Sequence, residues 1–254
     1  MKRLFFLLFL LTYPIYKLSG QVVHDYSGYK PKMNLVKVNL TSIPIRNYLF
    51  QYERVLSKSI SLAISYGTIP EGNIPLKKQI LKFADNDEET ERIFNSFMLT
   101  SYSVTPEIRF YTGKKGYGRG FYLAPFYRNA GYEGSNFLID FDDEFGNNQT
   151  IDLSGKIKSN TFGILIGAQW SLSKHLVLDW WILGPHYGTG KGSFDGVSSR
   201  PLSQSEQQDL RQSLEDIDIP MVDKTINVTS NGATMDLDGF WGGLRAGISF
   251  GFKF

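Results

Sequence analysis

Six charged side chains fall in segments whose residues otherwise alternate between apolar and polar. Three are acidic and three are basic: Lys37, Glu53, Glu107, Arg109, Asp179 and Arg245. Enclosed charges of both signs can form an ion or proton path, or they can neutralise one another in a structural network. Because an enclosed charge needs a partner, and partners of both signs are available here, the sequence favours the structural network.

The histidines offer little for catalysis. A nucleophile, a base and an orienting acid must converge in space, whereas His24, His175 and His186 are scattered along the chain. His186 with Asp195 and a loop serine is the one combination that would suit a lipid hydrolase, an acyltransferase or a protease. No motif supports that combination, so the sequence predicts no catalytic residue and no enzyme.

Metal, cofactor and nucleic-acid sites are not indicated. Asp140, Asp142, Asp143 and Glu144 invite a calcium interpretation, but their spacing matches no calcium loop. No helix follows the glycine-rich stretch 116–120, so a phosphate loop is not expected. The chain has no cysteine, which rules out thiolate ligands and disulfides. A formal charge of +2 gives no reason to expect a nucleic-acid partner.

The final stretch shows what kind of element must position the charges. From Leu244 to Phe254 one parity reads Leu, Ala, Ile, Phe, Phe, Phe, and the other reads Arg, Gly, Ser, Gly, Lys. A period of two predicts a β-strand with one apolar face. This strand runs to the last residue of the chain.

Seven earlier segments alternate in the same way. The predicted strands cover 33–43, 46–56, 60–68, 97–111, 121–132, 149–170, 175–187 and 236–254. The connections after the second, fourth and sixth strands are short, and those after the third, fifth and seventh are long. The loop over 69–96 holds candidate helices at 75–83 and 87–94, and 134–148 is predicted to be an acidic loop. The longest loop, 188–235, holds an amphipathic helix over 204–217 and a strand extension over 224–229.

The N-terminus predicts export. Lys2 and Arg3 precede an apolar run from Leu4 to Leu11, and Ser19-Gly20 supplies small residues for cleavage. We expect a signal peptide over 1–20, a periplasmic lead-in over 21–32 and one β-domain over 33–254. An uncleaved anchor is the alternative, but the apolar run is shorter than the roughly 20 residues that span a membrane.

These features together predict an outer-membrane β-barrel, with eight antiparallel up-and-down strands, apolar side chains toward lipid and polar ones toward the lumen. Alternating short and long connections place every long loop at the extracellular end. An eight-stranded barrel is filled by its own side chains, so we expect a plugged lumen. A soluble secreted β-protein would instead have to turn the apolar parity inward.

Four segments carry a family resemblance: Val36–Leu40, Gln51–Arg54, Thr105–Tyr111 and Gly242–Phe254. They resemble a family of outer-membrane barrels of unknown function found in Bacteroidetes and, more distantly, the small barrels of the outer-membrane protein A and X type. The resemblance implies no activity and no catalytic residue. The alternating aromatics Phe250, Phe252 and Phe254 resemble the C-terminal signal that the barrel-assembly machinery reads.

The predicted function is therefore that of an integral outer-membrane barrel, with a structural role or a surface-binding, adhesive role through its extracellular loops. Its expected partners are outer-membrane lipid, the assembly machinery and an extracellular ligand that the sequence does not identify. Two alternatives stay open, namely a narrow channel and an enzyme of the outer leaflet.

Overall fold

The computed structural model describes residues 32–75, 91–92, 95–217 and 219–254, and Lys32–Phe254 forms one compact unit. The predicted signal peptide and nearly all of the predicted lead-in lie outside the described residues. So do most of the two predicted helices over 75–83 and 87–94. No helix in the described part of the chain is long and apolar enough to cross a membrane.

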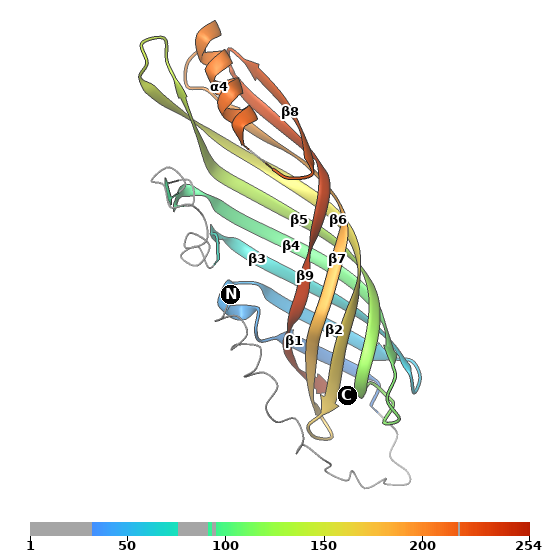
Figure 1. Cartoon of the computed structure of the whole chain (residues 1–254). Coiled ribbons are helices and arrows are strands. Elements are labelled where there is room, and N and C mark those ends of the chain that lie inside the picture. The colour runs from blue at the N-terminus through green and yellow to red at the C-terminus, as the bar shows by residue number, and fades with distance from the viewer. Residues whose placement is uncertain (1–31, 76–90, 93–94, 218) are drawn as a thin grey trace, which may run out of the picture. The chain divides into compact units, whose positions relative to one another are not determined.

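Nine antiparallel strands form one sheet, and eight of them close it into a barrel (Figure 1). Strands β1 to β7 pair in chain order, and β9 pairs with both β7 and β1. The bounds are β1 (Asn34–Asn39), β2 (Tyr48–Val55), β3 (Ile60–Asn73), β4 (Met98–Tyr111), β5 (Gly120–Asp142), β6 (Asn148–Ser171), β7 (Leu176–Val197), β8 (Val222–Thr229) and β9 (Gly232–Lys253). Strand β8 extends the sheet beyond the ring by pairing with β9. The predicted eight-stranded up-and-down barrel is confirmed.

The last residue of the chain completes the closure. The backbone N–H of Phe254 donates to the carbonyl of Asn34 at 2.9 Å, and the return bond is 3.1 Å long. Following paired residues round the ring from Val36 leads to Gly242 of β9, whereas Val36 pairs directly with Phe252. The register is therefore staggered by ten residues, as expected for strands tilted by about 35–45° from the barrel axis.

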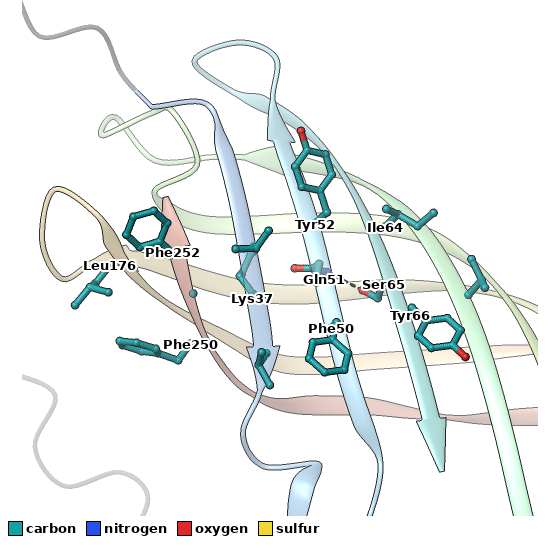
Figure 2. A pocket seen from close by; sticks show the side chains of 14 residues that line it. Lys37, Phe50, Gln51, Tyr52, Ile64, Ser65, Tyr66, Leu176, Phe250 and Phe252 are labelled. Carbon is teal, nitrogen blue, oxygen red and sulfur yellow. Dashed lines mark hydrogen bonds between the residues drawn. The ribbon is translucent and has the colours of Figure 1, made fainter. Parts of the chain in front are cut away.

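Side chains alternate strictly between the two faces of the wall. In β2 every second residue is buried and the others are exposed. Exposed apolar side chains cover the outward face from Tyr102 to Phe110 of β4 and from Leu176 to Tyr187 of β7. Figure 2 shows this face where β9, β1, β2 and β3 meet, with Phe50, Tyr52, Ile64, Tyr66, Phe250 and Phe252 grouped on it. The barrel therefore presents apolar residues to its surroundings and encloses polar ones.

The wall is much taller on one side than on the other. Strand β1 has 6 residues, whereas β5, β6, β7 and β9 have 23, 24, 22 and 22. The predictions of an acidic loop over 134–148 and of a loop directly after 187 are therefore wrong, because β5 continues to Asp142 and β7 to Val197. A bulge between Gly134 and Phe137 shifts the register and turns the following apolar residues inward. In β7, glycines at positions 188, 190, 192 and 196 remove the side-chain pattern that would have indicated a strand.

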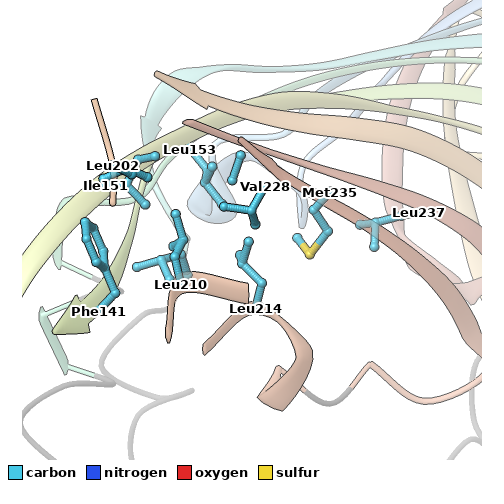
Figure 3. Packing of buried hydrophobic residues seen from close by; sticks show 11 residues of the cluster. Phe141, Ile151, Leu153, Leu202, Leu210, Leu214, Val228, Met235 and Leu237 are labelled. Atoms are coloured by element: carbon cyan, nitrogen blue, oxygen red, sulfur yellow. The ribbon is translucent and has the colours of Figure 1, made fainter. Parts of the chain in front are cut away.

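The tall side carries a second hydrophobic core beyond the ring (Figure 3). Helix α4 (Gln204–Asp216) confirms the predicted helix over 204–217, and its Leu210 and Leu214 are fully buried. They pack with residues of β5, β6, β8 and β9, among them Phe141, Leu153 and Met235. We call these extended strands with α4 and β8 the platform.

The first hairpin is shorter than predicted, because the chain leaves the sheet after Asn39. A 3-10 helix (Ile43–Ile45) follows, and Arg46 ends it in a left-handed conformation with φ of 58°. The Arg46 guanidinium donates to the carbonyl oxygens of Pro70 and Glu71, at 3.1 and 2.8 Å. The side chain thus supplies hydrogen bonds to carbonyl groups of β3 that a neighbouring strand would otherwise supply.

Candidate functional site

The structure brings the six predicted charged residues together inside the barrel. They come from β1, β2, β4, β7 and β9, and all point inward. Inward parity places them there because each strand must turn its apolar residues outward. The lumen near the short turns is therefore filled by a network of ion pairs.

Asp179 and Arg109 form the centre of the network. The Asp179 Oδ2 atom lies 2.6 Å from Arg109 Nη1 and 2.7 Å from Lys37 Nζ. The same carboxylate accepts hydrogen bonds from the Tyr122 hydroxyl at 2.8 Å and from the Trp181 indole N–H at 3.2 Å. One carboxylate thus serves two cations and two neutral donors.

Glu53 forms a second acceptor group beside it. Its Oε2 lies 2.5 Å from Lys37 Nζ and 3.2 Å from Arg109 Nη1. Its Oε1 accepts from the Ser61 and Tyr111 hydroxyls at 2.6 and 2.7 Å. Both oxygens are therefore fully used.

Glu107 links the centre to Arg245 on the last strand. Its Oε1 lies 2.6 Å from Arg109 Nη2, and its Oε2 lies 3.0 Å from Arg245 Nη1. The side chains of Arg109 and Glu107 are 0% exposed and that of Arg245 is 6% exposed. Arg245 is therefore the member of the network nearest to solvent.

The network closes the lumen rather than opening it. Its three acids and three bases balance, so the network itself carries no net charge. Apolar residues pack on both sides of it, with Leu35, Val55 and Val177 toward the short turns and Phe126, Leu165 and Trp181 toward the long loops. An ion path would require buried pairs to separate, and separating them would leave uncompensated buried charge.

Sequence reasoning did not single out five polar members of this network: Gln51, Ser61, Tyr111, Tyr122 and Gln169. Gln169 Oε1 accepts from Lys37 Nζ at 2.6 Å, and Gln51 Oε1 accepts from Arg109 Nη2 at 2.8 Å. All five share the inward parity of the six charges, so a list of every polar residue on that parity would have found them. Tyr111 and Tyr122 are harder to identify from the sequence, because an aromatic side chain is compatible with either face of the wall.

The three C-terminal phenylalanines lie on the outward face. Phe250, Phe252 and Phe254 are 38%, 46% and 50% exposed, and the rings of Phe252 and Phe254 are stacked with centroids 6.4 Å apart. They form an apolar stripe at the seam between the last and first strands.

The alternative hydrolytic grouping is not assembled. His186 points inward, whereas Asp195 of the same strand is exposed and accepts from the Thr234 hydroxyl at 2.9 Å. Nine residues of extended strand also separate them by roughly 30 Å. His24 lies outside the described residues, and the His175 ring stacks on Phe252.

Two of the acidic residues of the β5–β6 hairpin have local side-chain partners. Asp140 pairs with Arg92 and accepts from the Thr150 hydroxyl, and Asp143 accepts the backbone N–H groups of Phe145 and Asn147. In the described part of the chain, no group of three histidine or acidic side chains is placed to hold a metal ion.

Comparison with solved structures gives distant likenesses, among them the following two. The N-terminal β-barrel domain of Pseudomonas aeruginosa OprF shares 10% identity, covers 88% of this chain and 98% of its own, and gives a TM-score of 0.28. A major outer membrane protein from Thermus thermophilus shares 14% identity, covers 89% of this chain and 100% of its own, and gives a TM-score of 0.38. No protein-family profile and no curated protein matches. The barrel architecture is established by the strand pairing of this structure.

Proposed function

We propose that this protein is an integral outer-membrane β-barrel that displays its platform at the cell surface. The observation that carries the proposal is the inverted distribution of side chains, with ion pairs enclosed and apolar residues exposed all round the ring. In water this arrangement would leave the apolar face of the ring exposed to solvent. In a bilayer, closure satisfies every strand edge and the apolar belt meets lipid.

The height of the apolar belt supports a membrane-spanning position. It runs from Tyr102 to Phe110 in β4 and from Leu176 to Tyr187 in β7, close to the roughly 9–11 residues of a tilted membrane strand. One exposed or half-buried aromatic from each of β2 to β7 marks the belt end nearer the platform: Tyr48, Tyr66, Tyr102, Tyr127, Phe162 and Tyr187. Aromatic girdles of this kind are typical of the two bilayer interfaces.

The outer membrane is the membrane that fits this barrel. Both Asn34 and Phe254 lie at the end with short turns, which corresponds to the periplasmic side of bacterial barrels. The outward stripe Phe250, Phe252 and Phe254 is the proposed signal for the assembly machinery. Membership of the Bacteroidetes family also belongs to this proposal and rests on the four resembling segments alone.

The platform is the part best suited to contact other molecules. It has its own buried core, so its outer surface is held in a fixed arrangement rather than as a loose loop. The sealed lumen speaks against the channel alternative, and the separation of His186 from Asp195 speaks against the enzyme alternative. We therefore propose a surface-binding or structural role for the platform, with an extracellular partner.

Labelling of single cysteines on intact cells tests this proposal, because the natural chain has no cysteine. Phe145→Cys places a thiol in the β5–β6 hairpin, where the native side chain is 87% exposed. Ser59→Cys places one in the β2–β3 turn as the matched control. We expect a membrane-impermeant maleimide to label the first variant on intact cells and the second only after lysis. Labelling of Ser59→Cys on intact cells, or recovery of the protein in the soluble fraction, would overturn the proposal.

A further inference from the structure

Arg245 has hydrogen-bonding capacity that the ion-pair network leaves unused. Its Nη1 atom donates to Glu107, but its Nε and Nη2 atoms have no partner in the described structure although both are buried. These two N–H groups lie along one edge of the planar guanidinium. Such an edge is the fork that binds two oxygens of a carboxylate or phosphate at once.

The guanidinium packs against two aromatic rings. Its central carbon lies 4.4 Å from the ring centroid of Phe126 and 4.6 Å from that of Trp181. These ring contacts and the bond to Glu107 leave the Nε–Nη2 edge as the part of the guanidinium without a hydrogen-bond partner in the described structure. An anion that binds there meets two donors that the fold already holds in place, so binding costs little further side-chain entropy.

A second unpartnered polar atom lies nearby. His186 pairs across the wall with Gly243, two residues from Arg245, and its buried Nδ1 atom also has no partner among the described residues. The His186 ring packs edge-on against Phe126, with centroids 6.0 Å apart. The same aromatic ring thus contacts both groups and sets their relative position.

Glycines make room for this arrangement. Phe126, Gly163, His186 and Gly243 pair in one row across β5, β6, β7 and β9. A Cβ at Gly163 would stand 2.5 Å from Phe126 Cζ, and one at Gly243 would stand 3.0 Å from His186 Nε2. Larger residues in this row would fill the space that the ring and the imidazole occupy.

The local charge also favours an anion. Glu107, the only acid paired with Arg245 among the described residues, is shared with Arg109. Arg128 lies two residues along β5 from Phe126 on the same inward face, and within the described chain it forms no ion pair with a carboxylate within 4.0 Å. Gly243 is exposed and His186 and Arg128 are half-buried, so solvent reaches this level of the barrel.

We propose that Arg245, His186 and Arg128 form a luminal binding site for a small oxyanion, a carboxylate or a phosphate group, on the platform side of the ion-pair network. The Nε–Nη2 edge of Arg245 takes two oxygens of the anion. His186 Nδ1 supplies a further hydrogen bond, and Arg128 supplies charge. The site is separate from the platform surface and does not depend on the role proposed for that surface.

NMR titration of the full chain in detergent micelles tests the site, with acetate and inorganic phosphate as probes at constant ionic strength. The reporters are the Arg245 Nε–H signal and the Trp181 indole signal. We expect both signals to move and to saturate with at least one probe. Shifts that grow linearly without saturation would show an adventitious ion only, and would overturn the proposal.

Three variants separate the site from general electrostatics. Arg245→Lys keeps the charge but removes the fork, and His186→Gln and Arg128→Gln each remove one further group. Each is expected to weaken binding about tenfold, the effect of one charge-assisted hydrogen bond or close charge. Lys191→Gln, on the exposed outer surface beside Asp238, is the control and is expected to leave binding unchanged. If Arg245→Lys does not fold, unchanged binding in His186→Gln and Arg128→Gln still overturns the proposal.

Discussion

Asp179 shows at the scale of one residue how the lumen is held shut. Its carboxylate meets Arg109, Lys37, Tyr122 and Trp181 within 3.2 Å, and it is fully buried. A buried carboxylate of this kind is stable only because all of its hydrogen-bonding capacity is used by partners. Removing one member therefore costs more than the pair itself contributes, because the remaining charges cannot be solvated.

Asp179→Ala is expected to destabilise the folded barrel by about 3–5 kcal/mol, since it leaves Lys37 and Arg109 short of an acceptor. Denaturant unfolding in lipid vesicles, followed by tryptophan fluorescence, measures the loss. Asp238→Ala, which breaks the exposed pair with Lys191, is the control and should cost no more than about 1 kcal/mol. Equal losses in the two variants would contradict this account of the network.

The six charged members of this site could be predicted because period-two alternation places all of them on one face. The pairing within the network could not be predicted, because it depends on the ten-residue stagger of the closed ring. A different stagger would bring different strands opposite Arg109 from the same sequence.

Helix α4 shows at the scale of an element how a long loop becomes a rigid surface. Ser203 and Glu206 form a capping box, in which the Ser203 hydroxyl accepts from the Glu206 N–H at 3.4 Å and Glu206 Oε2 accepts from the Ser203 N–H at 2.8 Å. Leu210 and Leu214 then bind the helix to the extended strands. Both the start of the helix and its buried stripe are set by local sequence.

Leu210→Ala is expected to loosen the platform and to leave the barrel intact. Truncation of a fully buried leucine costs about 2–5 kcal/mol, and here the cost falls on a core that lies outside the ring. Limited proteolysis should cut the segment 198–221 faster, while unboiled protein keeps its folded mobility on a detergent gel. Gln208→Ala, at an exposed helix position, is the control. Loss of the folded band in Leu210→Ala would show that the platform and the ring fold as one unit.

The platform should also respond to acid through Glu206. Two hydrogen bonds from the Arg200 guanidinium and one from the Ser203 N–H lower the pKa of Glu206 from 4.5 to about 2. A lowered pKa contributes stability that is fully present above pH 4.5 and is lost as the pH falls toward 2. The protection factors of the α4 amides, taken relative to the intrinsic exchange rate at each pH, should therefore fall across this window in the natural protein. In Glu206→Gln this fall should be absent, and an unchanged profile would refute the role of this carboxylate.

The extensions of β5 and β7 beyond the ring could not be predicted, whereas the sixth strand over 149–170 and the strand over 224–229 agree with β6 and β8. A barrel strand in lipid turns apolar residues outward, whereas the platform turns Ile139, Phe141, Ile151 and Leu153 inward around α4. In β5 the bulge near Gly134 therefore carries the same sequence parity from the outward face to the inward one. Such a change of face is not visible in the sequence pattern alone.

The whole molecule combines two environments in one sheet, since the same strands leave the apolar belt and continue into the platform. Strand β6 shows the change along its outward parity. Trp170, Ile166, Ile164 and Phe162 are followed by Asn160, Lys158 and Lys156 as the chain is read toward the platform. The boundary between lipid and water is therefore expected near Asn160.

Arginine placed at two depths on β6 tests this boundary. Ile164→Arg puts a charge at an outward position that is 50% exposed in the middle of the belt, and it should lower the free energy of unfolding in vesicles by about 2–4 kcal/mol. Ser154→Arg lies on the same parity beyond the belt and should change it by less than about 1 kcal/mol, because the side chain stays in water. In detergent-free buffer the two variants should not differ in this way, since there is no bilayer to exclude the charge. Equal effects at the two depths in vesicles would mean that the apolar outward face is not a lipid face, and the barrel would then need a protein partner to cover it.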